Sequence, residues 1–205
     1  MEHSNIKNVV FDVGNVLVRW SPTEIVKLTF GDDVKPEPLA QAVFNSKTWR
    51  DLNKGLLTEE ETKLQYQDFH GLTEPECERL FYYIKQTQIL IYDSVKLLQR
   101  IKAAGYKVFV LTDNVNEIVS FLQSKYDFWQ QFDGEIVSAD VCLLKPQPEI
   151  YQSLLSKYDL EAQESVFLDD MPHNVSGAKS VGLSAIQFKH AEQCERELHA
   201  MGVAF

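Results

Sequence analysis

The stretch at residues 8–18 constrains the fold of this chain more than any other segment. Residues 9–11 (Val-Val-Phe) form an apolar run of strand-forming residues, of the length expected for a strand buried on both faces. The run ends in Asp12, and Gly14 and Asn15 follow with the backbone freedom that ends a strand. A carboxylate there is either a well-paired acid, such as a loop or helix cap, or a functional one. The stretch therefore predicts an acid at the carboxyl end of a parallel strand, where open α/β sheets bind ligands.

Further buried strands are predicted at about residues 107–112, 135–138, 166–170 and 184–188. Amphipathic helical patterns separate the strands, including those at residues 148–158 and 175–181, and a further pattern at residues 192–201 follows the last strand. Strands that alternate with helices in this way predict an α/β fold with a Rossmann-like, doubly wound parallel sheet.

Residues 20–88 interrupt this alternation, because no buried strand is predicted there. Four helical patterns occupy the segment, at residues 23–30, 38–53, 58–70 and 74–86. Thr58 and Glu61 have the spacing of a capping box at the start of the third pattern. The segment is too long for an ordinary connection, so we expect a four-helix cap inserted into a core made of residues 1–19 and 89–205.

The composition excludes several classes of protein. The 205 residues are 44% hydrophobic, which is typical of a soluble globular chain, and the net charge of −10 argues against nucleic-acid binding. The polar N-terminus and the short apolar runs predict neither a signal peptide nor a membrane span. Three cysteines without C-x-x-C spacing predict reduced thiols and a cytoplasmic location.

Two polar motifs follow the second and third predicted strands. Thr112, Asp113 and Asn114 place a hydroxyl and backbone N–H groups at a helix start, which suits an anion but is also a common helix cap. Lys145 precedes Pro146, and its side chain can project toward the ligand side of the sheet. Such a Lys-Pro pair by itself is usually a solvated loop.

The fourth strand ends in two adjacent carboxylates, Asp169 and Asp170, and Asn174 follows four residues later. Adjacent carboxylates at the end of an apolar strand repel one another unless a cation lies beside them. Oxygen ligands of this kind suit Mg²⁺, so this pair predicts a magnesium site.

Taken in chain order, these groups are an acid, a hydroxyl, a lysine and a carboxylate pair. With this order and spacing, the sequence resembles phosphatases of the haloacid dehalogenase superfamily from residue 8 to about residue 188, including the position of the helical cap. The first motif is most similar to a bacterial subgroup that includes sugar-phosphate phosphatases such as α-D-glucose-1-phosphate phosphatase. It is more distantly similar to the phosphatase domain of soluble epoxide hydrolase.

The resemblance implies a Mg²⁺-dependent phosphomonoester hydrolase that acts on a small phosphorylated metabolite such as a sugar phosphate. Asp12 would attack phosphorus and form an aspartyl-phosphate. Mg²⁺ would be held by Asp12, the backbone carbonyl of Gly14 and Asp170, and Asp169 would act as a further ligand or support the others.

The resemblance also assigns roles to the other motifs. Thr112 would bind the phosphate through its hydroxyl and Asp113 through its backbone N–H, while Lys145 would neutralise charge on the nucleophile and phosphate. Asn114 and Asn174 would support the site, Asn174 by orienting the carboxylates or a metal-bound water.

One position departs from the family pattern. Many of these phosphatases have a second aspartate two residues after the nucleophile, where it serves as general acid and base, and this chain has Gly14 there. The glycine keeps a carbonyl for the metal but cannot transfer a proton, so we expect slower turnover or a preference for good leaving groups, such as an anomeric phosphate. His173 could substitute as the acid, or it could be a solvent-facing loop residue.

Three alternatives stay open at this stage: a metal-independent 2-haloacid dehalogenase, a non-catalytic binding protein that has kept the fold, and a phosphomutase. The cap offers fewer indications. Its aromatic residues either line a substrate pocket or form the cap's own core; they are Trp20, Phe44, Trp49, Phe69, Tyr82 and Tyr83.

Overall fold

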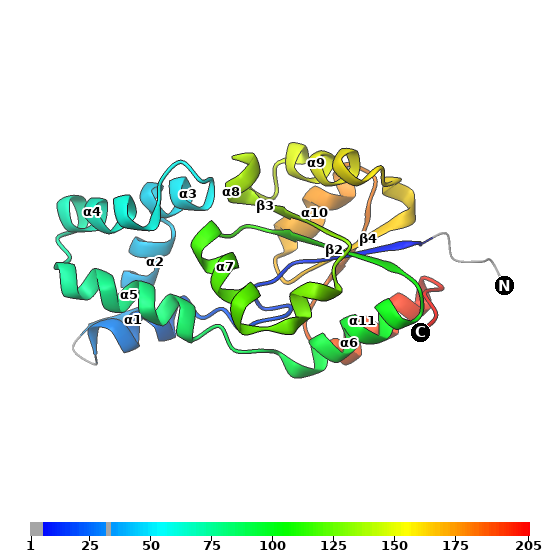
Figure 1. Ribbon diagram of the computed structural model, residues 1–205, viewed down its shortest axis with the longest axis horizontal. Helices are drawn as coiled ribbons and strands as arrows, with labels where there is room; N and C mark the ends of the chain where they lie inside the picture. Colours follow the sequence, from blue (N-terminus) through cyan, green and yellow to red (C-terminus); the bar gives the residue numbers. More distant parts are fainter. Residues whose placement is uncertain (1–5, 32–33) are drawn as a thin grey trace.

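The computed structural model of the protein describes residues 6–31 and 34–205, and for residues 69 and 70 it describes the backbone alone. Five parallel strands form one sheet in the order β3-β2-β1-β4-β5 (Figure 1). The strands are β1 (Asn8–Phe11), β2 (Lys107–Thr112), β3 (Gly134–Val137), β4 (Ser165–Asp169) and β5 (Ser184–Gln187). All five predicted strands are confirmed to within one or two residues at their ends. So is the α/β class with a doubly wound sheet.

Helices cover both faces of the sheet, and the strand residues alternate between two cores. Val9 and Phe11 of β1 pack in the core that includes residues of α6 (Tyr92–Ala103), α7 (Asn116–Lys125) and α11 (Ala191–Ala200). Val10 points the other way, into the core that α9 (Pro148–Tyr158) and α10 (Pro172–Ser180) complete. Because both faces are buried, the strand reads as a continuous apolar run. Short helical turns η1 (Asp127–Gln131), α8 (Ser138–Val141) and η2 (Ala162–Glu164) complete the connections.

The inserted segment lies at one end of the molecule, away from the two termini (Figure 1). It contains α1 (Pro22–Phe30), α2 (Pro36–Phe44), α3 (Lys47–Asn53), α4 (Glu59–His70) and α5 (Glu74–Gln86). Where one helix was expected at residues 38–53, the structure has two, so the segment holds five helices instead of four. Helix α2 ends at Asn45, and the Ser46 side chain caps α3 by accepting a hydrogen bond of 3.0 Å from the N–H of Trp49.

The capping box of α4 is confirmed. The Thr58 hydroxyl accepts from the Glu61 N–H at 3.2 Å, and the Glu61 carboxylate accepts from the Thr58 N–H at 2.8 Å. The division into a core of residues 1–19 and 89–205 and a cap of residues 20–88 stays a prediction.

The chain leaves the sheet region and returns to it along one pair of extended segments. The Arg19 N–H donates to the Ile89 carbonyl, and the Ile91 N–H donates to the Leu17 carbonyl, each at 2.9 Å. Val18 and Leu90 form an antiparallel bridge between these two bonds. The two segments that connect the sheet to the inserted helices, residues 17–19 and 89–91, therefore run side by side and are hydrogen-bonded to each other.

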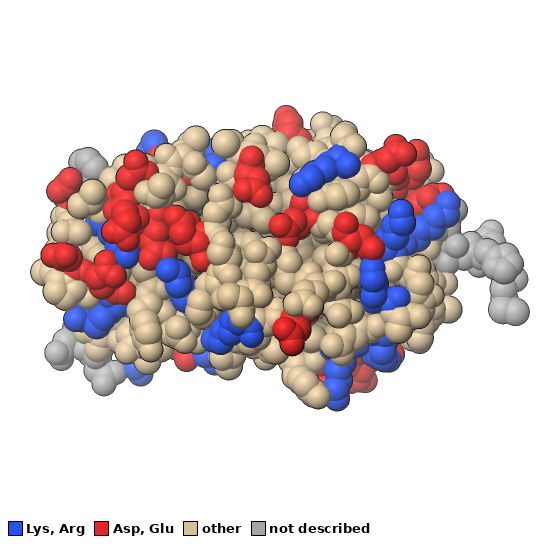
Figure 2. Space-filling view, in the orientation of Figure 1, with Lys and Arg blue, Asp and Glu red and all other residues tan. Residues whose placement is uncertain are grey.

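Acidic side chains gather over α4 and α5 in the view of Figure 2, which accounts for part of the net charge of −10. The first turns of these two helices carry five acids, which are Glu59, Glu60, Glu61, Glu74 and Glu76, and Glu78 follows in α5. Among the described residues, no helix is both long enough and apolar enough to cross a bilayer. Cys77, Cys142 and Cys194 are free thiols, as expected.

Candidate active site

The predicted site residues come together because three neighbouring strands end at the same edge of the sheet. Residue Phe11 of β1 pairs with Val110 of β2 and Leu168 of β4. Asp12 therefore follows directly beyond β1, between the ends of β2 at Thr112 and of β4 at Asp169. The Asp12 N–H donates to the Leu168 carbonyl at 2.9 Å, which extends the ladder to the acid itself.

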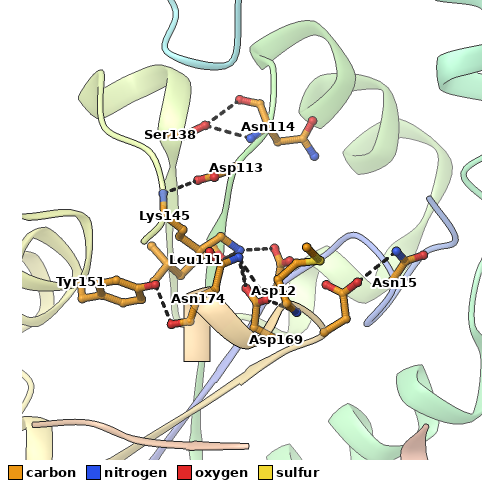
Figure 3. A network of polar contacts seen from close by, with 12 residues as sticks. Asp12, Asn15, Leu111, Asp113, Asn114, Ser138, Lys145, Tyr151, Asp169 and Asn174 are labelled. Carbon is orange, nitrogen blue, oxygen red and sulfur yellow. Dashed lines mark hydrogen bonds and ion pairs between the residues drawn. The ribbon is translucent and has the colours of Figure 1, made fainter. Parts of the chain in front are cut away.

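Lys145 lies at the centre of a network of polar contacts (Figure 3). Its Nζ is 2.8 Å from Oδ1 of Asp12 and 2.7 Å from Oδ2 of Asp169, and it donates to the Leu111 carbonyl at 3.3 Å. The lysine side chain is only 1% exposed. A solvated loop lysine is thereby excluded, and the loop enters the site through a cis Lys145–Pro146 peptide bond.

Asp169 is fully engaged by the protein. Its Oδ1 accepts from the Met171 N–H at 2.8 Å and from Asn174 Nδ2 at 3.1 Å, and its Oδ2 accepts from Lys145 Nζ and from Asn174 Nδ2 at 3.0 Å. A carboxylate offers about four lone-pair directions, and these contacts use all of them. Asp169, which has no exposed surface, is therefore held in one fixed orientation beside Asp12.

Asp170 has a different environment. One of its oxygens accepts from Asn15 Nδ2 at 3.1 Å, and the residue lines a cavity together with Gly14. Asn15 has a left-handed φ of 54°, and its Oδ1 accepts from the Trp20 N–H at 2.9 Å. The first sequence motif includes Asn15 for its backbone freedom, which the positive φ confirms, but it assigns no role to the side chain toward Asp170.

Together the acids form a candidate cation site. One carboxylate oxygen from each of Asp12, Asp169 and Asp170 lies within 4.8 Å of the others. The carboxylates on this edge are thus more numerous than the single Lys145 can neutralise. One buried oxygen, Oδ1 of Asn174, accepts no hydrogen bond from the described part of the chain.

The electrostatic cost of this arrangement raises the pKa of several acids. Burial raises the pKa of Asp12 to about 7, although Lys145 opposes the shift. Burial also raises the pKa values of Asp113 and Asp170, opposed by Lys145 for Asp113 and by the Asn15 hydrogen bond for Asp170. Burial would lower the pKa of Lys145, but its acidic neighbours outweigh this and raise it. The lysine therefore stays charged while the acids beside it are destabilised as anions.

The loop after β2 faces the same cavity. Thr112 is buried, and no hydrogen bond joins its hydroxyl to the described residues. Asp113 accepts a hydrogen bond of 3.0 Å from the Lys145 N–H, which joins this loop to the lysine loop. The Asn114 N–H donates to the Ser138 hydroxyl at 2.9 Å and is thus not offered to a ligand, while Asn114 Oδ1 accepts from the Val115 N–H.

Ser138 is a site residue that lies outside the predicted motifs. Its buried hydroxyl lies 2.6 Å from the carbonyl of Asn53, at the end of α3, and 3.2 Å from that of Asn114. It therefore joins the inserted helices to the loop that carries Thr112. Gly55 approaches the same place, since a Cβ there would lie 2.2 Å from the Ala139 carbonyl.

A cavity of about 400 Å³ separates the sheet edge from the inserted helices. The site residues form one wall, and Trp20, Trp49 and Arg50 lie on the other. Phe44 packs edge-on against both tryptophans, with ring centroids 5.3 and 5.0 Å away. Of the other expected aromatics, Tyr82 is exposed, Tyr83 is partly buried away from the cavity lining, and the Phe69 side chain lies outside the described residues.

His173 lies in the first turn of α10 instead of a loop, and it is both exposed and on the cavity wall. Gly14 lines the cavity as well, and a Cβ at this position would meet only the Cβ of Trp20, at an ordinary contact distance of 3.7 Å. Nothing steric in the described structure requires glycine at this position.

The fold and the site define a class of protein: a doubly wound α/β protein with a buried acid after its first strand and an ion-paired lysine beside it. Comparisons with known proteins agree with this class. The family model of the haloacid dehalogenase-like hydrolases matches residues 6–182. The chain belongs to this family, and it is an enzyme of the hydrolase class.

The proteins that this chain resembles carry different activities. A sesquiterpene phosphatase from Aspergillus oryzae is 27% identical over 88% of this chain and 88% of its own length. An enzyme of the family from Bacteroides thetaiotaomicron, in complex with magnesium and inorganic phosphate, has a TM-score of 0.74 at 19% identity and covers 90% of this chain and 95% of its own. The L-2-haloacid dehalogenase of Xanthobacter autotrophicus has a TM-score of 0.66 at 19% identity, over 98% and 85% of the two chains. At such identities the structural likenesses show the fold alone.

Proposed function

We propose that the protein is a Mg²⁺-dependent phosphomonoester hydrolase that acts through an aspartyl-phosphate on a small phosphorylated metabolite, such as a sugar phosphate. The observation that carries the proposal is the charge pattern at the sheet edge. Three carboxylates place one oxygen each within 4.8 Å of the others, one buried lysine pairs with two of them, and the group faces a cavity of about 400 Å³. A phosphate dianion would be repelled from these acids unless a cation accompanied it. A metal-independent dehalogenase, which attacks a carbon substrate, would have no use for the additional carboxylate of Asp170.

The residues fit a magnesium ion, because their donors are all oxygens and one acceptor, Oδ1 of Asn174, is buried without a partner among the described residues. We assign Asp12, Asp170 and the Gly14 carbonyl as the ligands. Asp169 supports them, because its lone pairs are already used by Lys145, Asn174 and a backbone N–H. When bound, Mg²⁺ would supply positive charge to the phosphoryl oxygens.

The chain's own residues account for the remaining steps. An oxygen of Asp12 attacks phosphorus in line, the new O–P bond forms, and the bond from phosphorus to the leaving oxygen breaks. Thr112, whose hydroxyl has no hydrogen bond to the described residues, and the Asp113 N–H hold phosphate oxygens, and Lys145 favours the ionised form of Asp12. Water then hydrolyses the aspartyl-phosphate, which releases phosphate and restores the carboxylate.

Proton delivery to the leaving oxygen is the weak step, because Gly14 has no side chain. His173 on the cavity wall is the available proton donor, and a leaving group that needs little protonation reduces the demand. The hemiacetal oxygen of a sugar 1-phosphate is such a leaving group. The sugar-phosphate assignment rests on this reasoning, and the sesquiterpene phosphatase among the relatives supports a phosphatase more broadly.

The test is phosphate release from p-nitrophenyl phosphate, with Mg²⁺ and with EDTA. We expect activity that requires Mg²⁺ and is lost in Asp12→Asn, while the surface variant Lys157→Gln keeps it. α-D-Glucose 1-phosphate should be hydrolysed faster than glucose 6-phosphate. Chloride release from L-2-chloropropionate in EDTA would instead establish the dehalogenase, and absence of both reactions in the Mg²⁺-loaded protein would favour a non-catalytic role.

A further inference from the structure

The cavity wall formed by the inserted helices is called the roof below, and the wall formed by the sheet-edge residues is called the floor. The roof carries side chains that hydrolysis of a phosphate group alone does not explain. Helix α3 directs Trp49, Arg50 and Asn53 toward the cavity, at the i, i+1 and i+4 positions that share one side of a helix. Asn45, just before α3, and Gln88, just after α5, line the same roof. The roof therefore combines a flat apolar surface with one cation and several amides.

Arg50 carries the only positive charge on this roof among the described lining residues. Its Nη1 donates to the Asn45 carbonyl at 2.8 Å, which holds the guanidinium in place but does not neutralise it. No carboxylate of the described chain forms an ion pair with it, whereas Arg19, Arg100 and Arg196 each pair with a glutamate. A guanidinium has five N–H donors, so most of those of Arg50 remain available to a ligand.

The apolar part of the roof is held rigidly. Trp20 and Trp49 are almost parallel, with an interplanar angle of 13° and centroids 6.0 Å apart, and Phe44 braces both. Trp49 is only 9% exposed. The same Trp20 is joined by its backbone N–H to Asn15, which holds Asp170. The apolar surface is thus fixed relative to the carboxylates on the floor of the cavity.

The two walls are therefore opposite in charge, with excess carboxylates on the floor and a guanidinium on the roof. At about 400 Å³ the cavity lies near the lower end of the range for small-molecule sites. With a cation on the floor, as the proposed function requires, a ligand that reaches both walls is a small molecule with an anionic group at each end and a compact apolar or ring portion between them.

We propose that the substrate carries, on its leaving group, a second anionic oxyacid group that Arg50 binds, while the part in between lies against Trp49. The inference rests on the proposed function, because the reacting phosphate occupies the other end of the cavity. Carboxylate and phosphate share the chemistry that a guanidinium recognises, namely paired oxygens for its planar fork of donors. Arg50 is exposed at the rim of the cavity, so a substrate with a neutral leaving group would leave its guanidinium to water and form no ion pair with it.

The experiment compares esters that differ only in the distal group. The purified, Mg²⁺-loaded protein is assayed with four aryl esters: phenyl phosphate, 4-carbamoylphenyl phosphate, 4-carboxyphenyl phosphate and 1,4-phenylene bisphosphate. A matched pair with a shorter spacer, 2-phosphoglycolate and 2-hydroxyethyl phosphate, is assayed in the same way. For each acid the readout is its kcat/KM divided by that of the neutral partner. Comparison of this ratio between wild type and variant cancels differences in leaving-group pKa.

We expect Arg50→Gln to lower this ratio by roughly 10- to 100-fold for at least one acid, the range of a charge-assisted hydrogen bond. Arg50→Lys, which keeps the charge but loses the fork, should fall between wild type and Arg50→Gln. A fall for the carboxylates only, or for the bisphosphate only, identifies which anion is used. Arg196→Gln, which removes an exposed ion pair with Glu192 on α11, is the matched control and should leave every ratio unchanged.

The inference is overturned if the wild-type protein hydrolyses these esters but Arg50→Gln changes no ratio by more than about the scatter seen with Arg196→Gln. Failure of the proposed function has a different signature. In that case the wild-type protein releases no phosphate from any of the esters, with the neutral ones included.

Discussion

Replacement of Lys145 by methionine tests the electrostatic construction of the site. Methionine keeps most of the volume of the lysine stem, so a cavity contributes little to the change. The substitution removes contacts of 2.8 Å to Asp12, 2.7 Å to Asp169 and 3.3 Å to the Leu111 carbonyl. Two buried carboxylates are then left without their counter-charge.

The expected magnitude follows from these contacts. Removal of one partner from a buried ion pair costs about 3–5 kcal/mol. Because this lysine serves two acids, we expect the free energy of unfolding in EDTA at pH 8 to fall by an amount at the upper end of that range. At pH 5 the loss should be roughly half as large, since Asp12 can be protonated there and one uncompensated charge disappears. Mg²⁺ at about 100 times its Kd should restore about 2.7 kcal/mol.

Urea unfolding followed by tryptophan fluorescence measures these quantities at both pH values. Lys157→Met provides the control, because that lysine is exposed; its Nζ donates to the Glu135 carbonyl at 3.1 Å and lies 5.3 Å from the centroid of the Tyr158 ring. It should change stability by no more than about 0.5 kcal/mol. A loss below about 1 kcal/mol for Lys145→Met at pH 8, or an equal loss at pH 5 and pH 8, would refute the reasoning.

Three further predictions concern single residues. The folded-state pKa of Asp12 is about 7, and its unfolded value is about 3.9, so the folded protein binds more protons between these values. The stability of the metal-free protein should therefore fall as pH rises from 4 to 7, and Asp12→Asn should flatten this fall in urea unfolding. Gly14→Asp adds the missing general acid at a position where a Cβ has room beside Trp20. It should raise kcat on alkyl phosphates by ~10²-fold over the control Gly14→Asn. Equal rates of the two variants would count against a proton-transfer role for this position. Ser138→Ala leaves the Asn53 carbonyl without its donor and should cost about 1–3 kcal/mol by urea unfolding, together with a lower kcat/KM; unchanged kinetics would show that this contact does not reach the site.

The sheet and its acids were predictable from the sequence because burial on both faces leaves a direct record in the chain. The buried part of β2, residues 108–111, is a continuous apolar run, and Thr112, the polar residue that ends it, marks the sheet edge. In a parallel sheet all such ends lie at one edge. The meeting of Asp12, Thr112 and Asp169 at one place therefore required only the correct order of strands.

Other features were not predictable, because they depend on tertiary contacts. The helical pattern at residues 38–53 continues through Asn45 and Ser46, and the break appears only when Ser46 caps the next helix. Asp169 and Asp170 have the same chemistry in the sequence. They differ in the structure because Lys145 and Asn174 saturate one, while Asn15 leaves an oxygen of the other toward the cavity.

Under the proposed function, the charges on the cavity floor couple the binding of the cation to the binding of the phosphate substrate. Asp12, Asp113 and Asp170 have pKa values raised by burial, so the metal-free site already resists further negative charge. Lys145 cannot relieve this, because its Nζ is held by Asp12 and Asp169. A phosphate dianion therefore needs the cation to enter, and a bound phosphate in turn supplies oxygens to the cation. Since such coupling is reciprocal, the factor by which Mg²⁺ strengthens phosphate binding must equal the factor by which phosphate strengthens Mg²⁺ binding.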